Sequence, residues 1–119
     1  MIIAVDGSAA SGKGTLAKRL AAHFNLAHLD TGALYRTLGL TLMREGENIE
    51  SVTQVQAVAA ISRFDFALIK DPAIRDDAVA AMASVVATMP DVRVGFLELQ
   101  RRFASDPPHG EGAILDGRD

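Results

Sequence analysis

The most constraining feature of the chain is a short apolar run that leads into a glycine-rich loop. Residues 2–5 are apolar, and the loop at 7–14 consists of small residues around one lysine. From Thr15 the apolar residues recur every three to four positions, which predicts a helix as far as Phe24. A buried strand, a glycine loop and a helix in this order are typical of an α/β unit. The apolar face predicted for the helix consists of Leu16, Leu20 and Phe24 with Ala17 and Ala21.

The loop has the spacing of a phosphate-binding loop: glycine, four residues, glycine and lysine at Gly7–Lys13. Small residues let consecutive backbone N–H groups converge on an anion, the following helix presents its positive end, and the lysine adds a mobile charge. Gly14 occupies the position that usually carries a hydroxyl. The alternative is a glycine-rich turn with an exposed lysine. We predict an ATP-binding loop made of Gly7, Ser8, Ala9, Ala10, Ser11, Gly12, Lys13, Gly14 and Thr15.

Helical and strand-like patterns alternate along the rest of the chain. Four-residue spacing of Leu34, Leu38 and Leu42 predicts a helix over 33–44 that ends near Gly46. Strands separated by helices indicate one α/β domain with a parallel sheet. The remaining patterns predict helices over 51–61 (Val52, Val55, Val58 and Ala59), 74–88 and 90–103 (Val94, Leu97 and Arg101 on one side), and strands over 64–69 and 113–115.

Composition excludes several classes of function. The 119 residues include no cysteine, which rules out disulfide scaffolds, thiolate zinc sites and cysteine nucleophiles. The formal net charge of −3 argues against a nucleic-acid-binding protein. No run approaches the roughly 18 apolar residues of a membrane span, and the N-terminus does not resemble a signal peptide, so a cytoplasmic protein is expected. No metal site is predicted, because His23, His28 and His109 lack metal-like spacing.

Three further segments show a resemblance to a known family. The order Lys13, Gly14, Thr15 is similar to that of nucleoside monophosphate kinases, and residues 29–36 (Leu-Asp-Thr-Gly-Ala-Leu-Tyr-Arg) resemble the bacterial cytidylate kinases. The segments 90–93 and 116–119 resemble the same family. The resemblance implies a P-loop NTPase-type parallel sheet flanked by helices. It also implies transfer of the γ-phosphate of ATP, with Mg²⁺, to CMP or dCMP, giving ADP and CDP or dCDP.

The resemblance also implies roles for particular residues. Lys13, Arg36 and Arg118 would be catalytic, with the two arginines on the acceptor phosphate. Pairing a cytosine edge with an acid, a hydroxyl and a guanidinium suits its amino donor and its two acceptors. The residues implied in CMP binding are Thr31, Tyr35, Arg36, Ser84, Arg93, Arg118 and Asp119.

The resemblance covers residues 1–45 and 75–119, and the chain is expected to be the N-terminal half of one P-loop kinase domain. Residues 60–88 would form a reduced insert that binds the nucleoside monophosphate. The expected partners are ATP and CMP or dCMP, without nucleic acid or membrane, and the protein is expected to be a monomer. Two alternatives remain: another small-molecule P-loop kinase, such as an adenylate or shikimate kinase, and a nucleotide-binding fragment without catalysis. Asp116 fits a metal-organising carboxylate and a turn cap equally.

Overall fold

The computed structural model describes residues 2–5, 13–30, 32–108, 110 and 112–116. The chain divides into two compact units. Unit 1 comprises Met1–Gly32 and Glu98–Asp119, and unit 2 comprises Ala33–Leu97. The three strands of the described residues all belong to unit 1. The two units are described in turn.

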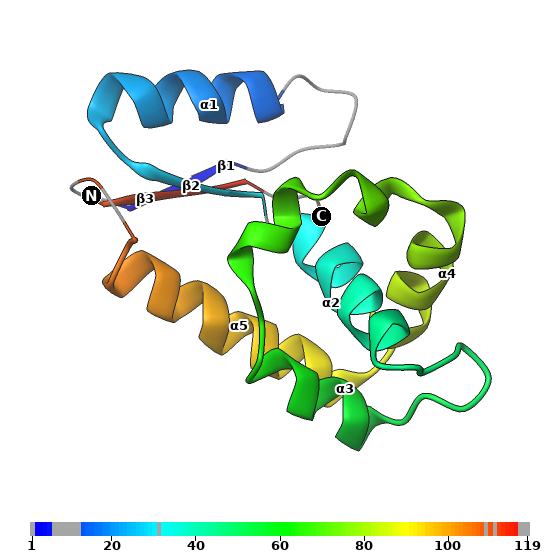
Figure 1. Ribbon diagram of the computed structural model, residues 1–119. Coiled ribbons are helices and arrows are strands. Elements are labelled where there is room, and N and C mark those ends of the chain that lie inside the picture. Colours follow the sequence, from blue (N-terminus) through cyan, green and yellow to red (C-terminus); the bar gives the residue numbers. More distant parts are fainter. Residues whose placement is uncertain (1, 6–12, 31, 109, 111, 117–119) are drawn as a thin grey trace. The chain divides into compact units, whose positions relative to one another are not determined.

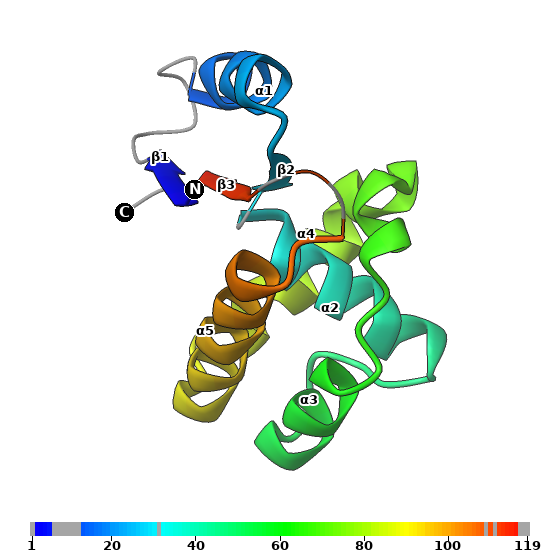
Figure 2. The same cartoon turned by 90° about the vertical axis from the view of Figure 1, so that its left-hand side faces the viewer.

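Unit 1 contains a three-stranded parallel sheet. Its strands are β1 (Ile2–Val5), β2 (Ala27–Asp30) and β3 (Ala113–Asp116), in the order β1-β3-β2. Figure 2 shows β3 between the other two strands. The parallel α/β sheet predicted from the sequence is confirmed, and β2 is an additional strand that the sequence did not predict as one.

The burial predicted for the first strand is wrong. In β1, Ile2 is 61% exposed, because β1 lies at the edge of the three described strands. The central strand is β3, where Ala113 and Ile114 are fully buried. A fully apolar strand therefore does not by itself identify the centre of this sheet.

Helix α1 (Lys13–Phe24) covers one face of the sheet (Figure 1). It begins at Lys13, earlier than the predicted Thr15. Ala17 and Ala21 are buried against Leu26 and Ile114, with Leu20 partly buried beside them. The predicted apolar face is only partly correct, since Leu16 and Phe24 are exposed. The helix thus meets the sheet mainly through its two small alanines, while Leu16 and Phe24 lie at positions around the helix that face away from this cluster.

The regular secondary structure in the described residues of unit 2 is all helical, and turns and loops connect the helices (Figure 1). The helix predicted over 33–44 is confirmed: Leu34, Leu38 and Leu42 are all buried. The elements that contribute residues to this unit are α2 (Gly32–Arg44), α3 (Gln54–Ile61), the 3-10 helices η1 (Phe66–Lys70) and η2 (Pro72–Arg75), α4 (Asp77–Val86) and α5 (Pro90–Ser105).

The strand predicted over 64–69 is wrong, because this segment forms the 3-10 helix η1. The Asp65 carboxylate accepts a hydrogen bond from the Ala67 backbone N–H at 2.9 Å, which starts the turn. The helix predicted over 74–88 is divided: η2 precedes α4, and Asp76 between them is extended. Asp65 and Asp71 cap η1 and η2 with their side chains and so compete with the periodic pattern, whereas Asp76 makes no side-chain cap hydrogen bond.

Helices α3 and α5 bury faces that the sequence pattern did not identify. In α3, which begins at Gln54, the buried residues are Ala57, Ala60 and Ile61, whereas Val52, Val55, Val58 and Ala59 are exposed or only partly buried. In α5, Val94, Leu97 and Arg101 are exposed, and Val92, Phe96, Leu99 and Phe103 are buried.

The end of α2 is closed by a Schellman motif. Gly46 has a φ of 90°, and its N–H donates to Met43 O at 3.1 Å while Glu47 N–H donates to Leu42 O at 3.0 Å. Only glycine adopts this left-handed conformation without strain. The predicted end of the helix near Gly46 is confirmed.

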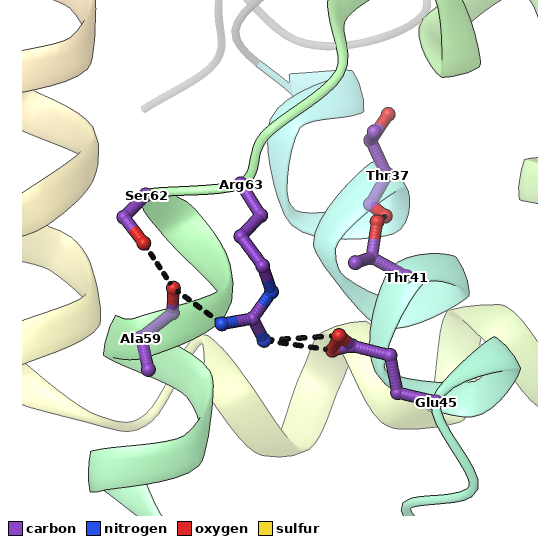
Figure 3. A network of polar contacts seen from close by, with 6 residues as sticks. All are labelled: Thr37, Thr41, Glu45, Ala59, Ser62 and Arg63. Atoms are coloured by element: carbon purple, nitrogen blue, oxygen red, sulfur yellow. Dashed lines mark hydrogen bonds and ion pairs between the residues drawn. The ribbon is translucent and has the colours of Figure 1, made fainter.

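Two arginine–carboxylate ion pairs connect the C-terminal end of α2 to neighbouring segments. The Arg63 guanidinium donates to both Glu45 carboxylate oxygens at 3.0 and 2.9 Å and to Ala59 O at 3.2 Å (Figure 3). Arg44 donates to the Asp71 carboxylate at 3.0 Å. Asp71 also accepts from Ala73 N–H at 2.9 Å, so one carboxylate caps η2 and holds α2.

No single helix in the described part of the chain is long and apolar enough to cross a membrane. Only α4 and α5 taken together reach that length and hydropathy, as a pair bent by 100°.

The contact between α2 and α4 predicts a steric limit at Gly39. A Cβ there would lie 3.0 Å from Val79 O and 3.2 Å from Ala83 N, which are backbone atoms that cannot rotate away. We expect Gly39→Leu to lower the free energy of unfolding by about 1–3 kcal/mol. Ala81→Leu, at an exposed position of α4, is the matched control. Equal midpoints of urea unfolding for the two variants would contradict this packing.

The bonds to Asp71 predict a dependence of stability on acid. The Ala73 N–H, followed by the Arg44 guanidinium, lowers the pKa of the Asp71 carboxyl below 3.8. A carboxyl group with a lowered pKa in the folded state stabilises that state at pH values above its unfolded-state pKa. This stabilisation is lost as the pH falls through the folded-state pKa. In Asp71→Asn we expect the denaturation midpoint to decrease less steeply than in the wild type as the pH is lowered below about pH 4. Asp106→Asn, at an exposed site, is the control and should retain the wild-type slope.

Candidate functional site

The carboxyl ends of the three strands in unit 1 are aligned. Val5 is paired with Asp116, and Asp116 is paired with Asp30, so the last residues of β1, β3 and β2 share one row of the sheet. In parallel α/β sheets this edge is where ligands bind. The predicted phosphate loop, Thr31 and Arg118 each follow one of these strand ends within two residues in the sequence.

Helix α1 begins at Lys13, the lysine of the predicted phosphate loop. A helix N-terminus has free backbone N–H groups and the positive end of the helix dipole, both of which favour a bound anion. Thr15 lies in the first turn and is exposed. The backbone of Lys13 and Gly14 is therefore placed at the helix end that the predicted chemistry requires.

Asp30 is a residue at this edge to which the sequence prediction assigned no role. Its carboxylate accepts a hydrogen bond from Gly32 N–H, the first residue of α2, at 3.0 Å. A carboxylate beside a helix N-terminus is stabilised by the free N–H groups and the helix dipole. Asp30 thereby links the end of β2 to the start of α2, on either side of Thr31.

In unit 2, two of the predicted CMP-binding residues lie close together. Tyr35 of α2 is half-buried, and its ring contacts Phe96 of α5 edge to face, with centroids 4.8 Å apart. The Arg93 guanidinium lies beside the Tyr35 hydroxyl. Burial raises the pKa of Tyr35 above 10.0, and the charge and hydrogen bonding of Arg93 lower it in part. At neutral pH the phenol therefore stays protonated beside a cation.

Two other predicted residues lie on the helices of unit 2. Ser84 is exposed on α4, and Arg36 is partly exposed on α2. Within the described residues, neither forms a hydrogen bond or ion pair with Tyr35 or Arg93. The predicted roles of Ser84 and Arg36 stay predictions.

The remaining predicted site residues lie outside the described residues, as does the side chain of Lys13. They are Gly7, Ser8, Ala9, Ala10, Ser11, Gly12, Thr31, Arg118 and Asp119. Their roles also stay predictions.

Among the described residues, no three His, Asp or Glu side chains form a group that could hold a metal ion. Of the residues in the predicted loop, Thr15 is the one whose side-chain oxygen the structure describes, and this side chain is exposed.

Comparisons with known proteins address the whole chain. Residues 3–119 match the family model described as Cytidylate kinase. Similar curated proteins include those named cytidylate kinase from Rhodopseudomonas palustris strain BisA53, 52% identical, and from Bradyrhizobium sp. strain ORS 278, 50% identical. Each match covers 100% of this chain and 54% of the relative. The chain thus spans about half the length of the curated relatives it matches.

The contacts of Tyr35 predict its titration. The chain has one tyrosine and no tryptophan, so the phenolate absorbance reports on Tyr35 alone. We expect ionisation above pH 10.0, and a further rise in pKa in Arg93→Met, because the cation that favours the phenolate is removed. Stability should fall as the pH rises from the unfolded-state pKa through the raised folded-state value. Arg101→Met on the same helix is the control, and an equal titration in both variants would refute the contact.

Proposed function

The chain belongs to the cytidylate kinase family, and on that premise we propose that the whole protein transfers the γ-phosphate of ATP to CMP or dCMP. The products are ADP with CDP or dCDP, and the reaction belongs to pyrimidine nucleotide metabolism. Its partners are small-molecule nucleotides, and we expect it to act as a cytoplasmic monomer. The parallel sheet with α1 is of the P-loop NTPase type, which is the fold of this family.

The observation that most supports the proposal is the alignment of strand ends in unit 1. Val5, Asp116 and Asp30 form one row. The predicted phosphate loop starts two residues after Val5, and the family segments 29–36 and 116–119 include Asp30 and Asp116 themselves. Phosphoryl transfer needs little covalent chemistry from the protein, because its main requirements are two nucleotides held in line and neutralised charge. We propose that the predicted phosphate loop, Thr31 and Arg118, which follow these strand ends in the sequence, meet the first requirement.

We assign the donor nucleotide to the N-terminus of α1. The loop amides and the Lys13 ammonium would hold the ATP phosphates, and the exposed Thr15 hydroxyl would contact a phosphate oxygen or the metal associated with ATP. Mg²⁺ supplies charge neutralisation when it is bound with the nucleotide. Lys13 adds a point charge that follows the terminal phosphate.

We assign the acceptor nucleotide to the predicted CMP-binding residues. Arg36 and Arg118 would hold its phosphate through planar two-donor contacts, and no general base is required because that phosphate is the nucleophile. Ser84, Arg93 and Asp119 would meet the cytosine edge, with Thr31 and Tyr35 beside the nucleotide. The insert proposed at residues 60–88 contains η1, η2 and α4.

Replacing the loop lysine tests the assignment of the donor site. In the whole protein we expect Lys13→Ala to lower phosphoryl transfer at least ~100-fold, because charge on the transferred group is no longer neutralised. CMP binding should persist, since Lys13 belongs to the donor side. Lys18→Ala, which removes an exposed lysine from the same helix, is the control and should retain turnover.

The measurement is a coupled ADP-release assay with CMP, UMP, AMP and shikimate as acceptors. Preference for AMP or shikimate would replace the proposed function with that of another P-loop kinase. ATP binding without any product would identify a nucleotide-binding protein, and full turnover in Lys13→Ala would refute the loop assignment.

A further inference from the structure

Helix α5 presents two residues of opposite character on adjacent turns. Arg93 is exposed, whereas Phe96, three residues later, is only 1% exposed. Residues three apart on a helix lie on the same side. Tyr35 of α2 contacts both: its ring meets Phe96, and its hydroxyl lies beside the Arg93 guanidinium. Tyr35 therefore spans from the buried core to an exposed cation.

The Phe96 ring is itself held by further contacts. Phe64 meets it edge to face with centroids 5.8 Å apart, and Phe66 meets Phe64 in the same way at 5.1 Å. A Cβ added at Gly95 would lie 2.9 Å from Ile61 Cδ1, which shows how closely α5 approaches α3. Packed rings leave few rotamers open, so Phe96 provides Tyr35 with a rigid support.

Among the residues that the structure describes, no carboxylate forms an ion pair with Arg93. Among the described arginines, Arg44 and Arg63 form ion pairs with carboxylates. The polar group beside Arg93 is the neutral phenol of Tyr35. A phenol accepts hydrogen bonds at one oxygen, whereas a guanidinium has five N–H donors. Contact with Tyr35 thus restricts the orientation of Arg93 without neutralising it. An arginine already ordered loses less conformational entropy when a ligand binds.

We propose that Tyr35 and Phe96 are positioning residues for Arg93: the Phe96 ring fixes Tyr35, and the Tyr35 hydroxyl orients the guanidinium toward the nucleotide base. This inference rests on the proposed function, in which Arg93 meets the cytosine edge. Phe96 affects the choice of base without touching the nucleotide. Discrimination between CMP and AMP then depends on a buried aromatic contact.

The test compares dissociation constants for CMP, AMP and ATP, measured by calorimetry on the whole protein. Tyr35→Phe keeps the ring and removes the hydroxyl, and Phe96→Leu removes the support. We expect each to lower the ratio of CMP to AMP affinity by roughly five- to tenfold, with ATP affinity unchanged. Phe103→Leu, at a buried phenylalanine further along α5, is the matched control and should keep the wild-type ratio.

A spectroscopic measurement on the 119-residue chain separates positioning from general loss of structure. The single tyrosine makes the phenolate titration specific for Tyr35. In Phe96→Leu we expect the Tyr35 titration to change, because burial of the phenol and its contact with Arg93 both change. Phe103→Leu should titrate like the wild type, and Phe96→Tyr, which retains a ring, should restore the wild-type ratio of nucleotide affinities.

The outcomes distinguish the inference from the function on which it rests. If Arg93→Met loses the preference for CMP while Tyr35→Phe and Phe96→Leu retain it, the positioning role is refuted and the proposed function stands. If the wild-type protein does not prefer CMP to AMP, both are refuted. Equal loss of CMP and ATP affinity in Phe96→Leu and Phe103→Leu would show a purely structural role for Phe96 and overturn the inference.

Discussion

Pairing of β3 with both β1 and β2 is the interaction on which the rest of unit 1 depends. These strands are distant in sequence, and only the central position of β3 brings the end of β1 and the end of β2 into one row. The pairing also completes the surface on which Ala17 and Ala21 of α1 pack. Without it, the strand ends that precede the predicted phosphate loop and Thr31 in the sequence would not lie in one row. The same backbone bonds thus support the fold and align the strand ends of the candidate site.

Much of this arrangement could be predicted from the sequence, because local chemistry decides it. The glycine loop between an apolar run and a periodic helix predicted β1 and α1, and the leucine spacing predicted α2. The strand at β2 was not predicted, since its four residues include a histidine and an aspartate and their pairing with β3 is non-local. The strand predicted over 64–69 failed because Asp65 supplies a local cap, and no pattern of alternation reveals whether a partner strand is present.

Prediction of the candidate site was limited in a different way. The family resemblance singled out Tyr35 and Arg93, and the structure brings those two together. The sequence pattern did not indicate Phe96 or Phe64, because an apolar residue in a predicted helix or strand is ordinarily interpreted as core. Their contribution is visible only through ring contacts between α2, α5 and the segment after α3. Support residues of this kind act through geometry, which a sequence pattern does not contain.

Small residues mark the closest contacts of several helices. Close approach of two elements requires small side chains at the contact, and this chain places Ala17 and Ala21 in α1, Gly39 in α2 and Gly95 in α5 at such positions. Larger residues beside them, such as Leu16 and Val94, then face outward. Leu16 and Val94 are exposed although Leu38 and Phe96 are buried, so hydrophobic size alone does not decide burial. Where two backbones approach closely, small residues occupy the contact, and the position of each larger side chain around its helix decides whether it is buried.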